Sequence, residues 1–117
     1  HLIDETAFKK MKDGVIIVNT ARGLIIDTQA LIASLKNGKV GFAALDTFEG
    51  EVGLYYLNKE TQRLDNDNMA LLKSFPNVIL SPHMAFYTEQ AVSDMVENSI
   101  KGILGLESGE DNRLAVK

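Results

Sequence analysis

Three side chains in this sequence have types that suit acid–base chemistry and anion binding. His83 is one of only two histidines, and an imidazole titrates near neutral pH, so it could act as a general acid or base. Glu51 could hydrogen-bond that ring, orient it and stabilise its protonated form. Arg22 could bind a carboxylate or a phosphate through two parallel hydrogen bonds. The ordinary alternatives are a loop or core histidine, a solvated acidic loop and a surface ion pair.

The elements that must position these side chains alternate along the chain. Three short apolar runs, residues 15–19, 40–46 and 78–81, are typical of strands covered on both faces in a parallel sheet. Capping residues and apolar spacing predict helices after Asp4, after Asp27, over residues 69–75 and after Thr88. This alternation predicts an α/β fold, a partial parallel sheet with right-handed crossovers and flanking helices.

Polar residues follow each predicted strand at its carboxyl end, where ligands bind in open α/β sheets. Arg22 follows the first strand, Asp46 and Glu51 follow the second, and His83 follows the third. We therefore expect these four side chains to gather at one edge of one sheet. Asp46 could accept a hydrogen bond from a ribose hydroxyl or a nicotinamide amide, or it could simply begin the loop that runs to residue 68.

Composition narrows the class of protein. The net charge of −4 leaves no basic surplus for nucleic acid or an anionic membrane, so we expect neither partner. The absence of cysteine excludes disulfides and thiolate metal sites, and we expect no metal and a cytoplasmic protein. The chain opens on HLIDETAF, without a methionine and directly in patterned sequence, so we expect a piece of a larger protein.

Three segments of the chain resemble the D-isomer-specific 2-hydroxyacid dehydrogenases: MKDGVIIVNTARGLIID, ALDTFEGE and SPHMAFYT. The resemblance covers nearly the whole chain and is closest to the D-lactate dehydrogenase branch, on the segments EGEVGLYY and AFYTEQA. It implies a Rossmann-like fold, with the rear part of an NAD-binding domain over residues 1–87. Residues 88–109 would be a long helix leading back to a substrate domain, and residues 110–117 a polar tail.

The resemblance also implies catalytic roles for three residues. Arg22 matches the arginine that binds the substrate carboxylate. Glu51 matches the glutamate that hydrogen-bonds the catalytic histidine. His83 matches that histidine, which donates a proton to the 2-oxo group during reduction and takes it back during oxidation.

Binding roles follow from the same resemblance. Thr20, Ala21 and Arg22 match residues that line the nicotinamide of NAD, and Asp46 matches one that contacts it. Phe86 is similar to a position that lines the substrate pocket.

The expected function is therefore NAD-dependent reduction of a 2-oxo acid, with pyruvate and D-lactate as the first candidates. Two alternatives stay open: reduction of 2-oxoisocaproate or another 2-oxo acid, and a dinucleotide-sensing interaction protein similar to corepressors of this fold. The sequence holds no G-x-G-x-x-G turn for a pyrophosphate, so we expect the chain alone to be inactive.

The last predicted helix bears on assembly because it carries an apolar stripe: Val92, Met95, Val96, Ile100, Ile103 and Leu104. An exposed stripe of this kind favours association. We expect a homodimer, or a domain-swapped pair.

Overall fold

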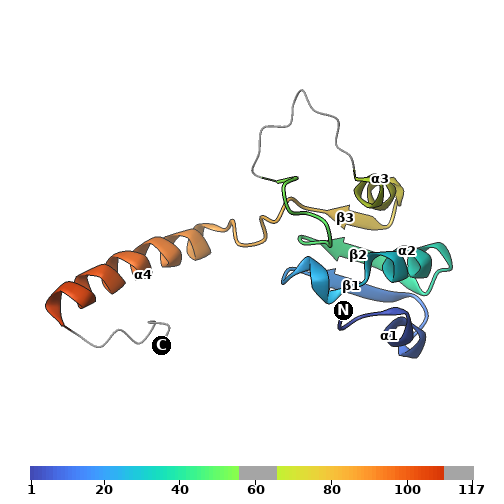
Figure 1. The fold of residues 1–117 in the computed structure, drawn as a ribbon, viewed down its shortest axis with the longest axis horizontal. Helices are drawn as coiled ribbons and strands as arrows, with labels where there is room; N and C mark the ends of the chain where they lie inside the picture. The colour runs from blue at the N-terminus through green and yellow to red at the C-terminus, as the bar shows by residue number, and fades with distance from the viewer. Residues whose placement is uncertain (56–65, 110–117) are drawn as a thin grey trace, which may run out of the picture. The chain divides into compact units, whose positions relative to one another are not determined.

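The computed structural model describes residues 1–55 and 66–109. Its contacts divide the chain into two compact units, His1–Met84 and Ala85–Lys117. The first unit contains the sheet with its helices, and the second contains one long helix (Figure 1).

The sheet of the first unit is parallel and has the strand order β1-β2-β3. Its strands are β1 (Val15–Asn19), β2 (Val40–Leu45) and β3 (Val78–Leu80). In the register, Asn19 lies beside Leu45, and Leu45 lies beside Leu80, so all three strands end at one level. The predicted α/β class and parallel sheet are confirmed, and the second and third strands end one residue earlier than expected.

The described helices are α1 (Glu5–Lys10), the 3-10 helix η1 (Gly23–Ile25), α2 (Thr28–Lys36), α3 (Asp67–Ser74) and α4 (Glu89–Ser108). Three of them, α1, α2 and α4, begin at the capping residues that the sequence indicates. The side chains of Asp4, Asp27 and Thr88 each accept a hydrogen bond from a backbone N–H of the helix that follows. These bonds satisfy donors that would otherwise lack a partner in the first turn.

Helix α3 begins two residues before the predicted position because its cap is Asn66. The Oδ1 atom of Asn66 accepts from the Met69 N–H at 2.8 Å, and its Nδ2 donates to the Gly50 carbonyl at 3.2 Å. One side chain thus caps α3 and ties it to the loop that follows β2. The part of this loop over residues 56–65 lies outside the described residues.

One face of the sheet carries the hydrophobic core. Ile17, Ala43 and Leu45 lie buried on this face and belong to the same cluster as Phe8 of α1, Leu31 of α2 and Leu72 of α3. Side chains alternate between the two faces of a strand, so this core uses every second strand residue.

The opposite face of the sheet is open, and the expectation of strands covered on both faces is wrong for the described residues. Ile16 and Val18 of β1 are each 66% exposed, and Ile79 of β3 is 57% exposed. The register places Val18, Ala44 and Ile79 side by side on this face. Both faces of the sheet carry apolar residues, but α1, α2 and α3 pack against only one of them.

The long helix α4 agrees with the predicted start at Thr88 and the predicted end at Ser108-Gly109. Gly109 takes the left-handed conformation, with φ of 73°, that commonly ends a helix. No residue of α4 is buried, and its apolar stripe is exposed except at Val92, which is half-buried. Among the described residues, no helix is long and apolar enough to cross a membrane.

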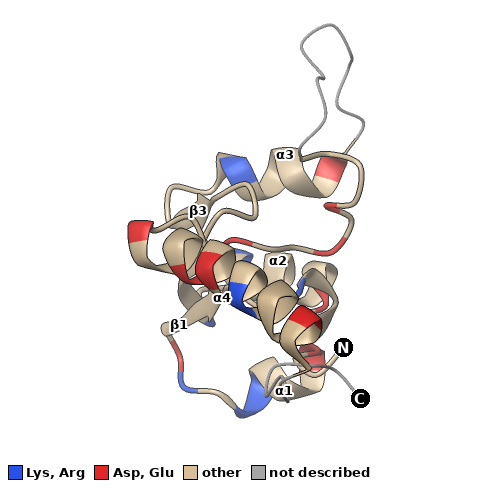
Figure 2. Cartoon of the chain, turned by 90° about the vertical axis from the view of Figure 1, so that its left-hand side faces the viewer, with Lys and Arg blue, Asp and Glu red and all other residues tan. Residues whose placement is uncertain are grey.

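Charged residues of both signs lie on α1, α3 and α4 (Figure 2). Two ion pairs link residues four apart: Lys9 with Glu5 on α1 at 2.7 Å, and Lys101 with Glu97 on α4 at 3.2 Å. The Lys101 ammonium lowers the pKa of the Glu97 carboxyl. Exposed pairs of this spacing stabilise a helix slightly.

Candidate active site

The segments that follow the three strands meet at one edge of the sheet, as the sequence predicts. Backbone hydrogen bonds continue past the strand ends: the Asp46 N–H donates to the Asn19 carbonyl, and the Ser81 N–H donates to the Leu45 carbonyl, at 2.9 and 3.0 Å. The His83 N–H then donates to the Asp46 carbonyl at 2.9 Å. These bonds bring the residues after β2 and β3 within reach of one another.

His83 and Glu51 form a hydrogen-bonded pair at this edge. The Nδ1 atom of His83 lies 3.1 Å from Oε1 of Glu51, and the two side chains are 33% and 14% exposed. The other carboxylate oxygen of Glu51 accepts from the Phe48 N–H at 3.1 Å, which fixes the carboxylate in place. Because Glu51 engages Nδ1, proton exchange with a ligand would run through Nε2.

The backbone of His83 is in an uncommon conformation. Its φ of 55° lies in the left-handed region that residues other than glycine rarely adopt. Its N–H lies within hydrogen-bond distance of two carbonyls, those of Asp46 and Ser81, at 2.9 and 3.0 Å. Strained conformations of this kind persist where surrounding bonds hold them, and they cluster at functional sites.

Asp46 is buried, and its carboxylate fixes the turn around His83. Its Oδ1 accepts from the Ser81 hydroxyl at 2.5 Å and from the Met84 N–H at 2.8 Å. One carboxylate therefore binds the chain on both sides of the histidine. Sequence reasoning missed this positioning part, and the nicotinamide contact expected of Asp46 stays a prediction.

The turn after β1 presents Arg22 at the surface. Thr20, Ala21 and Arg22 are all exposed, and Nη1 of Arg22 donates to the Ala21 carbonyl at 2.7 Å. Within residues 1–55 and 66–109, no carboxylate pairs with this guanidinium. A planar cation in this position suits an incoming carboxylate.

Asn19 shapes that turn, and sequence reasoning gave it no role. Its Oδ1 accepts from the Ala21 N–H at 3.1 Å, and its Nδ2 donates to the Arg22 carbonyl at 3.0 Å. Asparagine commonly binds the backbone two residues on in this way. Its place at the end of a buried strand, directly before the polar turn, was the available signal.

Gly23 allows two of the converging segments to touch. A Cβ atom at this position would overlap the backbone of Phe48 and lie 2.6 Å from the Glu49 nitrogen. This close approach requires glycine, because any side chain here would push away the loop that carries Glu51.

Tyr55 lies beside the site and was not predicted to belong to it. It is half-buried, and its ring meets that of Phe48 edge to face, with centroids 6.2 Å apart. Burial raises the pKa of the Tyr55 hydroxyl above 10.0, and the carboxylates of Glu51 and Asp46 raise it further.

Phe86 belongs to the second unit. Its ring is partly exposed and meets that of Tyr87 edge to face, with centroids 6.3 Å apart. Its expected place in a substrate pocket stays a prediction.

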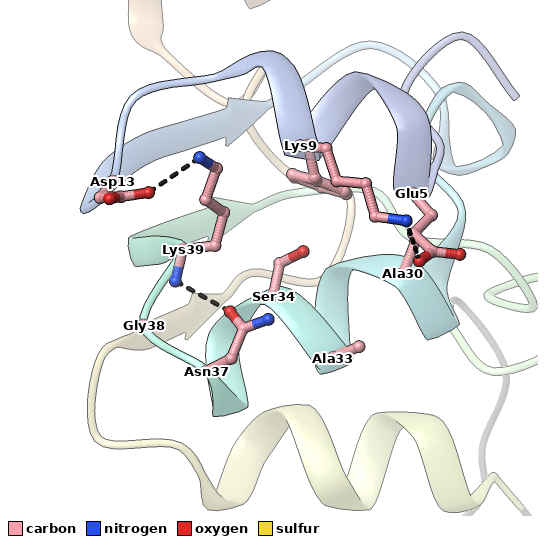
Figure 3. A pocket seen from close by; sticks show the side chains of 10 residues that line it. Glu5, Lys9, Asp13, Ala30, Ala33, Ser34, Asn37, Gly38 and Lys39 are labelled. Atoms are coloured by element: carbon pink, nitrogen blue, oxygen red, sulfur yellow. Dashed lines mark hydrogen bonds and ion pairs between the residues drawn. The ribbon is translucent and has the colours of Figure 1, made fainter.

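A groove of about 580 Å³ between α1 and α2 lies away from these residues (Figure 3). Its lining includes Asp13 and Lys39, which precede β1 and β2 and form an ion pair at 2.8 Å. The groove thus opens at the amino ends of the strands. Since ligands of open α/β sheets bind at the carboxyl ends, the groove is not the candidate site.

Comparison with known proteins agrees with the geometry. The family model described as D-isomer specific 2-hydroxyacid dehydrogenase, NAD binding domain, matches residues 1–85. The chain is 49% identical over 107 residues to an aromatic 2-oxoacid reductase of Clostridium sporogenes, covering 92% of this chain and 32% of that protein.

Solved structures give the same result. A D-lactate dehydrogenase from Treponema pallidum has a TM-score of 0.90 at 40% identity, over 100% of this chain and 35% of that one. The NAD complex of a D-isomer specific 2-hydroxyacid dehydrogenase from Lactobacillus delbrueckii has a TM-score of 0.89 at 34% identity, over 99% and 35%. The chain spans about a third of the length of these relatives. By its sequence and its fold, it belongs to the NAD-binding domain family of the D-isomer-specific 2-hydroxyacid dehydrogenases.

Proposed function

We propose that this chain supplies the acid–base part of an NAD-dependent D-2-hydroxyacid dehydrogenase, with pyruvate and D-lactate as its preferred substrate pair. The observation that carries the proposal is the His83–Glu51 hydrogen bond at the carboxyl edge of a parallel sheet. The exposed Arg22 follows the neighbouring strand β1 at the same edge.

Each charged or titratable residue has its own role in this proposal. Arg22 binds the carboxylate of the 2-oxo acid through its guanidinium, which orients the substrate. His83 donates a proton to the 2-oxo oxygen during reduction, and Glu51 stabilises the charged ring before that transfer. A general acid placed in this way accelerates a reaction by about 10²–10⁴-fold.

NADH supplies the hydride when it is bound. Thr20, Ala21 and Arg22 fit its nicotinamide end, because they form an exposed turn just past the end of β1. Asp46 follows β2, and its N–H bonds the carbonyl of Asn19, the residue directly before that turn. The sequence contains no glycine-rich turn for the pyrophosphate, so this chain alone binds the dinucleotide weakly. We therefore assign the activity to a longer protein. It would carry these residues together with the segment that precedes the matching residues in the relatives.

The proposal extends to assembly and location. The exposed apolar stripe of α4 supports a homodimer, or a domain-swapped pair of the isolated chain. The cytoplasmic location expected from the composition stays a prediction, which cell fractionation would test.

The test uses the full-length protein that carries these residues. Loss of NADH absorbance is followed with pyruvate, 2-oxoisocaproate and phenylpyruvate as substrates. The fastest turnover with pyruvate supports the proposal, whereas preference for another substrate of the panel keeps the mechanism and changes the substrate. Tight NADH binding without turnover of any of them would refute the enzyme and favour a dinucleotide sensor.

A further inference from the structure

Glu49 makes contacts that the chemistry of the candidate site does not use. Its Oε1 lies 2.9 Å from Nε2 of His1, and its Oε2 accepts from the Thr28 N–H at 3.4 Å, at the start of α2. The other ring nitrogen of His1 lies 3.7 Å from Oδ2 of Asp27, the cap of α2. The carboxylate of Glu49 thus joins the loop after β2 to the start of α2 and to the first residue of the chain.

The loop that carries Glu49 is also held from two other directions. The Phe48 side chain is buried in the core, and Gly23 packs directly against the backbone of Phe48 and Glu49. These contacts hold Phe48 and the backbone beside it, and the Glu49 carboxylate adds the attachment to the start of α2.

The position of this loop sets the position of the Glu51 carboxylate. The Phe48 N–H donates to Oε2 of Glu51 at 3.1 Å, and the Glu51 N–H donates to the Phe48 carbonyl at 3.3 Å. Glu51 is therefore bound to the residue next to Glu49, while its Oε1 reaches His83. A shift of residues 48 and 49 would move the carboxylate away from the imidazole.

We propose that Glu49 is a positioning residue that keeps the Glu51 carboxylate at Nδ1 of His83. This inference rests on the proposed function, because it needs an active enzyme to be seen. Glu49 acts through Glu51.

An ordinary exposed ion pair would contribute little, and Glu49 differs from one in two ways. The side chains of His1 and Glu49 are only 31% and 35% exposed, compared with 71% and 74% for Lys9 and Glu5. Glu49 also accepts from a backbone N–H in the first turn of α2, where the helix dipole favours a negative charge.

The test compares Glu49→Ala with Glu49→Gln in the full-length protein. We expect Glu49→Ala to lower kcat about tenfold, with the KM for NADH unchanged, because small displacements of catalytic groups cost up to about 100-fold. Glu49→Gln should recover most of the rate, since its amide oxygen still accepts from Thr28 and its amide nitrogen can donate to His1.

Two further variants complete the design. Thr28→Pro removes the N–H that Glu49 accepts from, at a helix position that tolerates proline, and should lower kcat in the same direction. Glu5→Gln is the matched control, because it breaks only the exposed pair with Lys9 on α1.

The outcomes separate the two proposals. An inactive wild-type protein refutes the proposed function. An active wild type with normal kcat in Glu49→Ala, or a loss that matches the fraction unfolded in a thermal melt, overturns the positioning role. If Glu49→Ala does not fold, an unchanged kcat in Thr28→Pro overturns it instead.

Discussion

At the scale of single residues, the backbone of His83 fixes its place as firmly as its side chain does. The left-handed conformation is held by the carbonyls of Asp46 and Ser81, and the Asp46 carboxylate binds the chain on either side. The imidazole consequently projects from a turn whose backbone conformation is fixed by these hydrogen bonds. Preorganisation of this kind is what a positioned acid requires.

Tyr55 gives a prediction for alkaline pH. Its pKa is raised by burial and by Glu51 and Asp46, so the neutral hydroxyl is favoured in the folded protein. The stability that this shift contributes is fully present below the unfolded pKa of about 10. It is lost as pH rises through the folded pKa.

We therefore expect Tyr55→Phe to reduce the loss of stability above pH 10.0, the ordinary value for this group. Urea unfolding of the wild type and of Tyr55→Phe across the alkaline range would measure this loss. Tyr87→Phe is the control. Equal alkaline losses in wild type and Tyr55→Phe would contradict the assigned cause.

Residue types alone indicated Arg22, Glu51 and His83, and the resemblance assigned their roles. The contact between Glu51 and His83 was foreseeable because both follow neighbouring parallel strands. Asn19, Glu49 and the positioning part of Asp46 were not foreseeable in the same way. Several of their contacts run to backbone atoms, which carry no sequence signature, and the side-chain partners of Glu49 and Asp46 lie far away in the sequence.

At the scale of elements, the contact of η1 with the loop after β2 depends on Gly23. We expect Gly23→Ala to destabilise the protein by about 1–3 kcal/mol, as overpacking commonly does, and to lower kcat by displacing Glu51. Thermal melts with activity measurements on the folded protein would show both effects.

Gly105→Ala is the matched control for this substitution. A Cβ at Gly105 meets nothing within 4 Å, and the residue lies within α4, so alanine should stabilise by about 0.5–1 kcal/mol. Equal changes in stability for the two substitutions would show that the close approach at Gly23 does not restrict the residue at this position.

Thr47 gives a second prediction at this scale. It is fully buried at the end of β2, and within the described residues its hydroxyl has no hydrogen-bond partner. Because an unpaired buried hydroxyl is costly, we expect Thr47→Val to raise the free energy of unfolding by about 1 kcal/mol.

The contrary result for Thr47→Val would have a specific meaning. A void of about 10 Å³ lies beside this residue, close to the smallest that holds one water. A loss of stability measured by urea unfolding would indicate an ordered water bound to the hydroxyl and would contradict the unpaired state.

Strand positions followed from apolar runs and helix starts from capping residues, and these strand bounds and helix starts differ from the structure by at most two residues. The early start of α3 was not predicted, because the sequence does not distinguish Asn66 as a cap from the polar residues around it. The 3-10 helix η1 was not predicted either, because three residues are too few to show a helical pattern.

At the scale of the whole molecule, the open face of the sheet predicts association of the isolated chain. Ile16, Val18 and Ile79 form an exposed apolar surface in the first unit, and such surfaces mark interaction sites. We expect the 117-residue chain to sediment as a species larger than 12.9 kDa and to bind a hydrophobic dye.

The variant Ile16→Thr/Val18→Thr should reduce both signals while it keeps residues that suit a strand. A monomer at high concentration that binds no dye would contradict this prediction. The apolar pattern on both strand faces indicated a covering layer, but the described residues provide that layer on one face alone.

The variant His83→Asn tests whether His83 is the acid of a 2-oxo acid reductase. Asparagine tolerates the left-handed conformation, so the turn should persist while the proton donor is lost. In the full-length protein, we predict that pyruvate reduction falls by about 10²–10⁴-fold with NADH affinity unchanged. A variant that reduces pyruvate at the wild-type rate would show that His83 is not the acid.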